Sequence, residues 1–186
     1  MPDDSMIQPN DKEKFEKALA TRNFEIELFW KRALFFWGFI AAAFIALAGS
    51  HSKYPRLAIL LSCFGVVCSL CWTLANRGSK YWQENWETKV DLVGKNRVGD
   101  LFTKNEPIQD KGIWLSARKY SVSRLTIGLS DYTFLLWVSV LLYETISHVN
   151  TLTCPLMFRD LAVILYVLFT AVFSVLLICF SKSIIR

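Results

Sequence analysis

Two carboxylates interrupt an apolar run from Leu125 to His148. If a membrane span begins near Leu125, Asp131 lies about 9 Å inside it and Glu144 reaches the far interface. If the span runs from Tyr132 to Val149, Asp131 is interfacial and Glu144 is buried. A charge at the bilayer centre costs roughly 2.5 to 3.5 kcal/mol and usually faces a bundle interior or a water-filled cavity. The acids are therefore candidates for an ion path or a proton-linked group. The alternative is an interfacial acid, or one paired with a polar neighbour for assembly.

The chain also has five cysteines and two histidines, which are residue types that bind metals or perform redox chemistry. Cys68 and Cys71 form a C-x-x-C on one helix face, but inside an apolar stretch and without a second pair. We therefore expect small buried hydrophobes there. Cys154 is expected on the oxidising side, either free or in a disulfide between subunits. His51 and His148 map to outer ends of spans, as interfacial residues or as a metal- or pH-sensing pair. The sequence predicts no metal site and no cofactor.

A block rich in tryptophan and acids lies between the second and third apolar stretches. At helical spacing its apolar side chains share one face, formed by Trp82, Trp86, Val90 and Val93. The acids point the opposite way, namely Glu84, Glu87 and Asp91. This helix either docks on the N-terminal helix or a neighbouring subunit, or it forms a binding surface. The candidate interaction surface comprises Trp82, Glu84, Trp86, Glu87, Arg118, Lys119 and Arg124.

No constellation of residues points to catalysis. The polar parts of the chain contain no Gly-rich phosphate loop, no nucleophile–base pair and no HExxH. A membrane enzyme would require such a constellation, so we expect that the protein is not an enzyme.

Four apolar stretches must position these side chains, at residues 33–50, 57–76, 125–147 and 161–181. About 20 apolar residues in a helix cross the roughly 30 Å hydrocarbon core of a bilayer. The first two stretches are joined by a short turn that contains Pro55, and the last two by a short loop, so each pair is expected to form an antiparallel hairpin. The sequence predicts an all-α integral membrane protein with four transmembrane helices and a helical cytoplasmic layer.

The polar segments provide that layer. An amphipathic helix is expected from Asp11 to Lys31 within residues 1–32, with an apolar face formed by Phe15, Leu19, Ile26, Phe29 and Trp30. Arg22 lies in that stripe, either in a surface salt bridge or snorkelling, or facing an acid across a subunit contact. In the middle segment, residues 77–124, a second helix is expected to end near Gly94, before a loop from Lys95 to Gly112.

The basic residues predict the orientation. Residues 1–32 carry six Lys and Arg, residues 77–124 carry ten and the tail, 182–186, carries two, whereas the two short loops carry two and one. The positive-inside rule therefore places both termini and the middle segment in the cytoplasm. This distribution also explains the net charge of +5, so no nucleic-acid partner is expected. No cleavable signal peptide is visible, and the first span is expected to serve as the insertion signal.

Three stretches resemble the RipA-like family of octameric bacterial inner-membrane proteins. They are Arg22 to Ile40 (RNFEIELFWKRALFFWGFI), Tyr81 to Glu87 (YWQENWE) and Ser121 to Leu125 (SVSRL). They cover about a sixth of the chain, in the order and placement expected relative to the spans. The resemblance implies a cytoplasmic middle region, residence in the inner membrane and assembly as a homo-oligomer. It implies no catalytic residues.

The predicted function is that of a self-assembling bacterial inner-membrane protein. Its cytoplasmic layer, Asp11–Lys31 and Lys80–Gly112, is expected to bind a protein or small molecule or to sense a condition. Repeating the third span around a symmetry axis would create a ring of carboxylates. The alternative function is a membrane-perturbing or pore-forming effector of a bacterial, anti-phage defence system.

Overall fold

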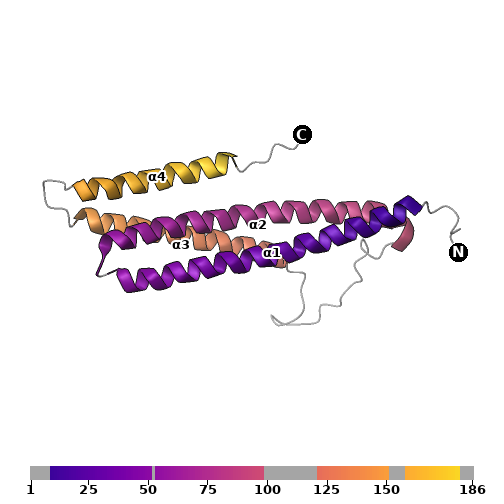
Figure 1. Ribbon diagram of the computed structural model, residues 1–186, viewed down its shortest axis with the longest axis horizontal. Coiled ribbons are helices and arrows are strands. Elements are labelled where there is room, and N and C mark those ends of the chain that lie inside the picture. The colour runs from indigo at the N-terminus through magenta and orange to yellow at the C-terminus, as the bar shows by residue number, and fades with distance from the viewer. Residues whose placement is uncertain (1–8, 52, 99–120, 151–157, 181–186) are drawn as a thin grey trace, which may run out of the picture. The chain divides into compact units, whose positions relative to one another are not determined.

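The computed structural model describes residues 9–51, 53–98, 121–150 and 158–180, and these residues form four α-helices with no strand among them (Figure 1). Helix α1 runs from Pro9 to Ser50, α2 from Pro55 to Val98, α3 from Val122 to Asn150 and α4 from Phe158 to Phe180. Each is long and apolar enough to cross a membrane. The predicted all-α membrane fold is confirmed.

Each polar helix is continuous with its span in α1 and α2. Helix α1 has 42 residues and α2 has 44, about twice the roughly 20 needed for a crossing. Helix α1 begins at Pro9, two residues before the expected start, since proline is tolerated in the first turn. The expected end of the second helix near Gly94 was wrong, because α2 continues to Val98. A single glycine costs a helix only about 1 kcal/mol relative to alanine, so it does not end one by itself.

The chain forms two compact units. The first, here termed the polar unit, contains α1 as far as Trp30 and α2 from Gly78. The second, the span unit, contains α1 from Lys31, α2 as far as Arg77, and helices α3 and α4. Lys31 and Arg77 therefore mark the points at which α1 and α2 pass from one unit to the other.

In the span unit α2 is the central helix. In the most apolar 18-residue stretch of α2, 56% of the residues are buried, against 22% in that of α1, 17% in that of α3 and 11% in that of α4. The main core packs Trp137 of α3, which is fully buried, against α1 and α2. The Trp137 ring stacks on Phe44 with centroids 4.3 Å apart, and it lies where a side chain on Gly65 would stand. Glycine is therefore required at position 65 to admit this ring.

Helix α4 packs through a smaller cluster, in which Val163 meets Ile59 and Cys63 of α2. Most of its apolar surface is exposed within the single chain, including Phe169 and Val172. Lipid tails are as apolar as these side chains, so such a surface is compatible with lipid contact or with contact between subunits.

In the polar unit the two helices pack through narrower stripes than the sequence predicts. On α1, Ala18 and Phe29 are buried, whereas Trp30 is 45% exposed. On α2 the buried side chains are Ser79, Gln83 and Val90. Trp82, which is expected on one face with Trp86 and Val90, is 42% exposed within the single chain, whereas Val90 is buried. The contact follows the heptad-like spacing of positions 79, 83 and 90, and this leaves part of each apolar face uncovered.

Candidate functional site

Asp131 and Glu144, the two acids in the third span, both have basic partners. Asp131 accepts two hydrogen bonds from Arg77 of α2, at 2.8 Å from Nη1 to Oδ1 and 2.9 Å from Nη2 to Oδ2. This bidentate geometry is the strong form of an arginine–carboxylate pair. Both side chains are partly exposed, at 50% for Arg77 and 36% for Asp131. The pair joins the end of α2 in the span unit to the first half of α3.

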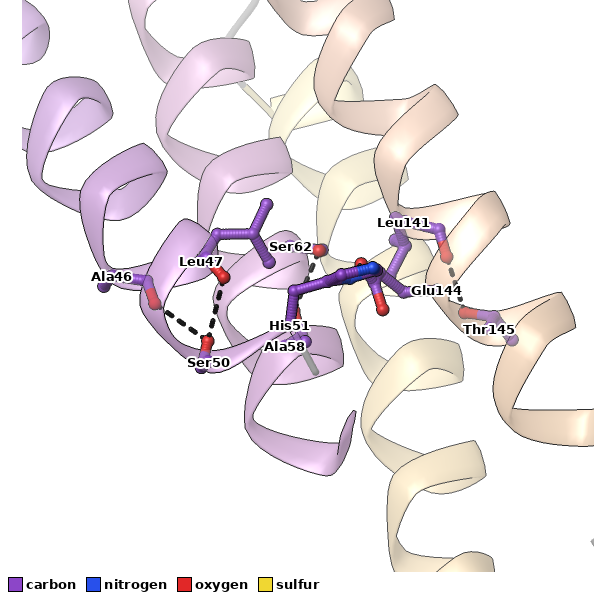
Figure 2. Close-up of polar contacts among 9 residues, drawn as sticks. All are labelled: Ala46, Leu47, Ser50, His51, Ala58, Ser62, Leu141, Glu144 and Thr145. Atoms are coloured by element: carbon purple, nitrogen blue, oxygen red, sulfur yellow. Dashed lines mark hydrogen bonds and ion pairs between the residues drawn. The ribbon is translucent and has the colours of Figure 1, made fainter. Parts of the chain in front are cut away.

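Glu144 lies deeper and pairs with His51, the residue that follows α1 (Figure 2). His51 Nδ1 donates to Glu144 Oε1 at 2.5 Å. The Glu144 side chain is only 7% exposed, whereas His51 is 49% exposed and stacks on Tyr143 with centroids 6.0 Å apart. This pair joins the turn between α1 and α2 to the second half of α3.

The two ion pairs fasten α3 to the first helical hairpin at two levels. Their acids are separated by 13 residues, or about 20 Å along α3. No charged residue lies between them in the sequence, from Tyr132 to Tyr143. Of the alternatives that the sequence left open, this geometry corresponds to acids paired with polar neighbours, and here both acids are paired within one chain.

The sequence did not indicate Arg77 or His51 as partners. The pairs join residues 54 and 93 positions apart, and one sequence carries no direct signal for such contacts. The available signal was positional, because each base stands at the end of a span and each acid lies toward one end of the third span. Opposite charges at matching depths of neighbouring spans are expected to pair, because an isolated charge there is costly.

The hydroxyl groups around the deeper pair are satisfied within their own helices. Ser50 donates to the Ala46 carbonyl, and Ser62 donates to the Ala58 carbonyl, each at 2.8 Å (Figure 2). Thr145 donates to the Leu141 carbonyl at 2.7 Å. Such bonds to the preceding turn satisfy a hydroxyl in lipid, where water is absent. The hydrogen of each of these hydroxyls is therefore donated to a backbone carbonyl of its own helix.

An open apolar groove of about 270 Å³ lies in the span unit. Its lining comes from α1, α2 and α3, with Trp37, Ile40, Ala41, Phe44, Trp72, Leu129 and Thr133. The hydroxyl of Thr133 donates to the Leu129 carbonyl at 2.8 Å. The lining therefore offers contact to an apolar chain and no acid–base pair.

In the polar unit, α2 carries the tryptophan and acidic residues on opposite sides of its buried stripe. Around the helix axis, two flanks lie on either side of Val90: the tryptophan flank at about 40 to 100° in one direction, and the acidic flank at about 60 to 120° in the other. The tryptophan flank consists of Trp82, Trp86 and Lys89. The acidic flank consists of Glu84, Glu87 and Asp91. The predicted opposition of tryptophans and acids therefore holds, although the buried stripe lies between them.

Each flank is further organised by local contacts. Lys89 Nζ lies 4.2 Å from the centroid of the Trp86 ring, which is a cation–π contact. Lys80 pairs with Glu84 at 3.3 Å, and Arg22 of α1 pairs with Glu87 at 3.8 Å. Arg22 thus forms the surface salt bridge that was one of the predicted alternatives.

The remaining residues of the predicted interaction surface lie elsewhere. Arg124 belongs to α3 in the span unit, and Arg118 and Lys119 lie outside the described residues. In the polar unit, Trp82 and Trp86 lie on the tryptophan flank, and Glu84 and Glu87 lie on the acidic flank.

The candidate metal and redox residues do not form a joint site in the described part of the chain. Cys63 is buried, Cys68 and Cys71 are partly buried, and all three are free thiols. Within the described ranges, no group of three or more His, Cys, Asp and Glu side chains could hold a metal ion. Cys154 lies outside the described residues. His51, one of the two candidate histidines, contacts Glu144 and Tyr143.

Comparison with known proteins agrees with a membrane protein. A family model, the octameric membrane protein family (8xMP), matches residues 12–146, which include the described part of the polar unit from Lys12, the first two spans and most of the third. A search of curated proteins and a search of solved structures each returned no match. The predicted family of octameric membrane proteins is thereby confirmed, and the RipA-like relationship remains a resemblance. The family model matches more than half of the residues of the chain, and the chain therefore belongs to the octameric membrane protein family.

Proposed function

We propose that the protein is a non-enzymatic, self-assembling scaffold of the bacterial inner membrane, whose polar unit binds a partner or senses a condition on the cytoplasmic side. The observation that carries the proposal is the contrast between the two units. In the span unit, the acids of α3 are committed to ion pairs that brace the bundle. In the polar unit, large apolar side chains remain exposed.

The orientation of this scaffold rests on its basic residues. The segments that contain the polar unit, residues 1–32 and 77–124, together carry sixteen of the 21 Lys and Arg residues. The positive-inside rule favours the cytoplasm for such segments. A Lys89→Cys variant of a chain whose five native cysteines are replaced by alanine should therefore react with a membrane-impermeant maleimide only after cells are opened. Labelling in intact cells would contradict this orientation.

Exposed apolar side chains support partner binding by the polar unit. Phe24 is 57% exposed, Tyr81 is 47% exposed and Leu92 is 71% exposed. Tyr81 and Leu92 lie on the side of α2 opposite to its buried stripe. Exposed apolar residues mark interaction sites, and we assign the side of α2 that carries Tyr81 and Leu92 to a partner.

The proposal that the protein is not an enzyme is supported by the hydroxyls beside the His51–Glu144 pair and by the lining of the apolar groove. The hydroxyls at the His51–Glu144 pair donate to carbonyls of their own helices, and the apolar groove offers no acid–base pair. Catalysis requires a nucleophile and a base within hydrogen-bond reach, or a metal with an open position.

A second function, a membrane-perturbing effector in bacterial defence, is favoured by one observation. Arg77 and His51 are half exposed although their carboxylate partners lie in the third span. A trigger could withdraw these bases without unfolding the bundle. The released carboxylates, repeated around the axis of an oligomer, would form a ring that favours cations.

Expression at controlled levels with a potential-sensitive dye separates the two functions. A scaffold leaves the membrane potential unchanged when its level rises. An effector collapses the potential, and the variants Asp131→Asn and Glu144→Gln should weaken that collapse. Collapse that persists unchanged in both variants, with assembly intact, would remove the ring of carboxylates from consideration.

A further inference from the structure

The two flanks of α2 in the polar unit differ in chemistry. The tryptophan flank combines two large aromatic side chains with Lys89. The acidic flank holds three carboxylates, with Glu84 and Glu87 exposed at 59% and 48% of their side-chain surface. Lys80 and Arg22 pair with Glu84 and Glu87, and Asp91 leaves this side with one net negative charge. A positive, aromatic surface and a net negative surface therefore lie on opposite sides of one helix.

Helix α1 contributes apolar side chains to the side of the helix pair that carries the acidic flank of α2, here termed the acidic side. The Arg22–Glu87 ion pair shows that the Arg22 side of α1 and the acidic flank of α2 lie on the same side of the helix pair. Leu19 and Ile26 are neighbours of Arg22 on that side, three residues before it and four residues after it. Trp30 follows four residues after Ile26 and is 45% exposed. The acidic side thus also presents apolar groups.

The hydrocarbon of the bilayer does not cover Leu19, Ile26, Trp82 and Trp86, whereas Trp30 adjoins the first span. Residues 9–30 carry nine charged side chains, and residues 78–98 carry seven. Such a density of charge excludes both segments from hydrocarbon, where each charge costs several kcal/mol. Exposed tryptophan in a water-facing unit is typical of protein interfaces, in which tryptophan and arginine supply much of the binding energy.

We infer that the polar units of neighbouring copies meet through these two sides, with the tryptophan flank of one copy packed against the acidic side of the next. Trp82 and Trp86 then cover Leu19, Ile26 and Trp30 of the neighbour. Lys89 approaches the neighbour's Glu84 and Asp91. The inference rests on the self-assembly proposed above and names the surfaces that perform it.

Charge complementarity favours this head-to-tail contact over a two-fold one. A two-fold contact places the same patch on both partners, so Lys89 would approach the Lys89 of its partner, or acids would approach acids. A head-to-tail contact uses two different surfaces on opposite sides of each copy, and it closes into a ring when the rotation per copy divides a full turn. An octameric family is compatible with such a ring.

Cysteine cross-linking tests the contact. Glu84→Cys and Lys89→Cys are introduced together into a chain whose five native cysteines are replaced by alanine, and a short bis-maleimide is added to membranes. The expected result is a ladder that extends beyond the dimer, with no cross-link in either single variant. A product that stops at the dimer, or cross-linking of a single variant, would indicate a two-fold contact and overturn the inference.

A charge exchange in the native-cysteine chain provides a second, independent test. Lys89→Glu should lower the mass of the detergent-solubilised oligomer, and Lys89→Glu combined with Glu84→Lys should restore it. Thr88→Glu, an exposed neighbour outside both flanks, is the matched control and should leave the mass unchanged. A full-sized oligomer in Lys89→Glu and in Trp82→Ala would overturn the assigned contact while leaving self-assembly in place. A wild-type chain of monomeric mass would instead remove the proposed assembly itself.

Discussion

Replacing Gly65 by alanine should destabilise the protein, although alanine is the better helix former. A Cβ built on Gly65 meets three ring atoms of Trp137 well inside van der Waals distance. The ring cannot move aside easily, because it is fully buried and stacked on Phe44. The methyl group must therefore displace either the ring or the contact between α2 and α3.

The expected magnitude combines two opposing effects. Overpacking a core costs about 1 to 3 kcal/mol, and the confined Trp137 ring places Gly65→Ala near the upper end. Replacing a glycine within a helix by alanine returns about 1 kcal/mol. The net loss is therefore about 2 kcal/mol, which corresponds to a fall in Tm of roughly 4 to 8 °C for a chain of this size.

The assay is thermal unfolding in detergent, followed by far-ultraviolet circular dichroism. Gly128→Ala in α3 is the matched control, since nothing lies within 4 Å of its Cβ position. It should raise the Tm by roughly 2 to 4 °C. In a Trp137→Phe background, Gly65→Ala should cost less than in the wild-type chain, because the smaller ring leaves room. A Tm that rises equally in Gly65→Ala and Gly128→Ala would refute the packing of Trp137 on Gly65.

Three further tests of the span unit use the same assay. His51→Ala should destabilise more than Glu144→Gln, because the first leaves a buried carboxylate without its partner and the second removes the charge; equal losses would contradict the pair. A double-mutant cycle of Arg77→Ala and Asp131→Asn should give a coupling of about 1 kcal/mol, limited by the exposure of both side chains, and additive losses would argue against the contact. Trp137→Ala should cost about 3 to 5 kcal/mol, whereas a loss under about 1 kcal/mol would place that ring outside the core.

Sequence reasoning identified the elements of the fold because the signals were local. Four apolar stretches of suitable length predicted four membrane-crossing helices, and the structure describes four such helices. It missed the continuity of α2 through Gly78 and Gly94, since a glycine lowers helix stability only slightly when flanking residues favour the helix. It grouped Trp82 with Val90 on one apolar face, but it could not give the centre of the buried stripe, because helical periodicity does not determine it.

The candidate site was predicted only in part, for a different physical reason. The cost of charge in a bilayer singled out Asp131 and Glu144 from the sequence alone. Their partners, Arg77 and His51, lie 54 and 93 positions away and come together only through the packing of α3 on the first hairpin. Such pairings depend on tertiary structure, so the sequence alone could not name the partner of either acid.

The most direct test of the account is the mass of the detergent-solubilised wild-type protein, measured by light scattering and corrected for bound detergent. Membership of an octameric family predicts one discrete species of eight 21.4 kDa chains, about 171 kDa in total. A monomer at the same protein concentration would contradict self-assembly, and with it the scaffold, whereas a dimer would contradict the proposed head-to-tail contact between polar units.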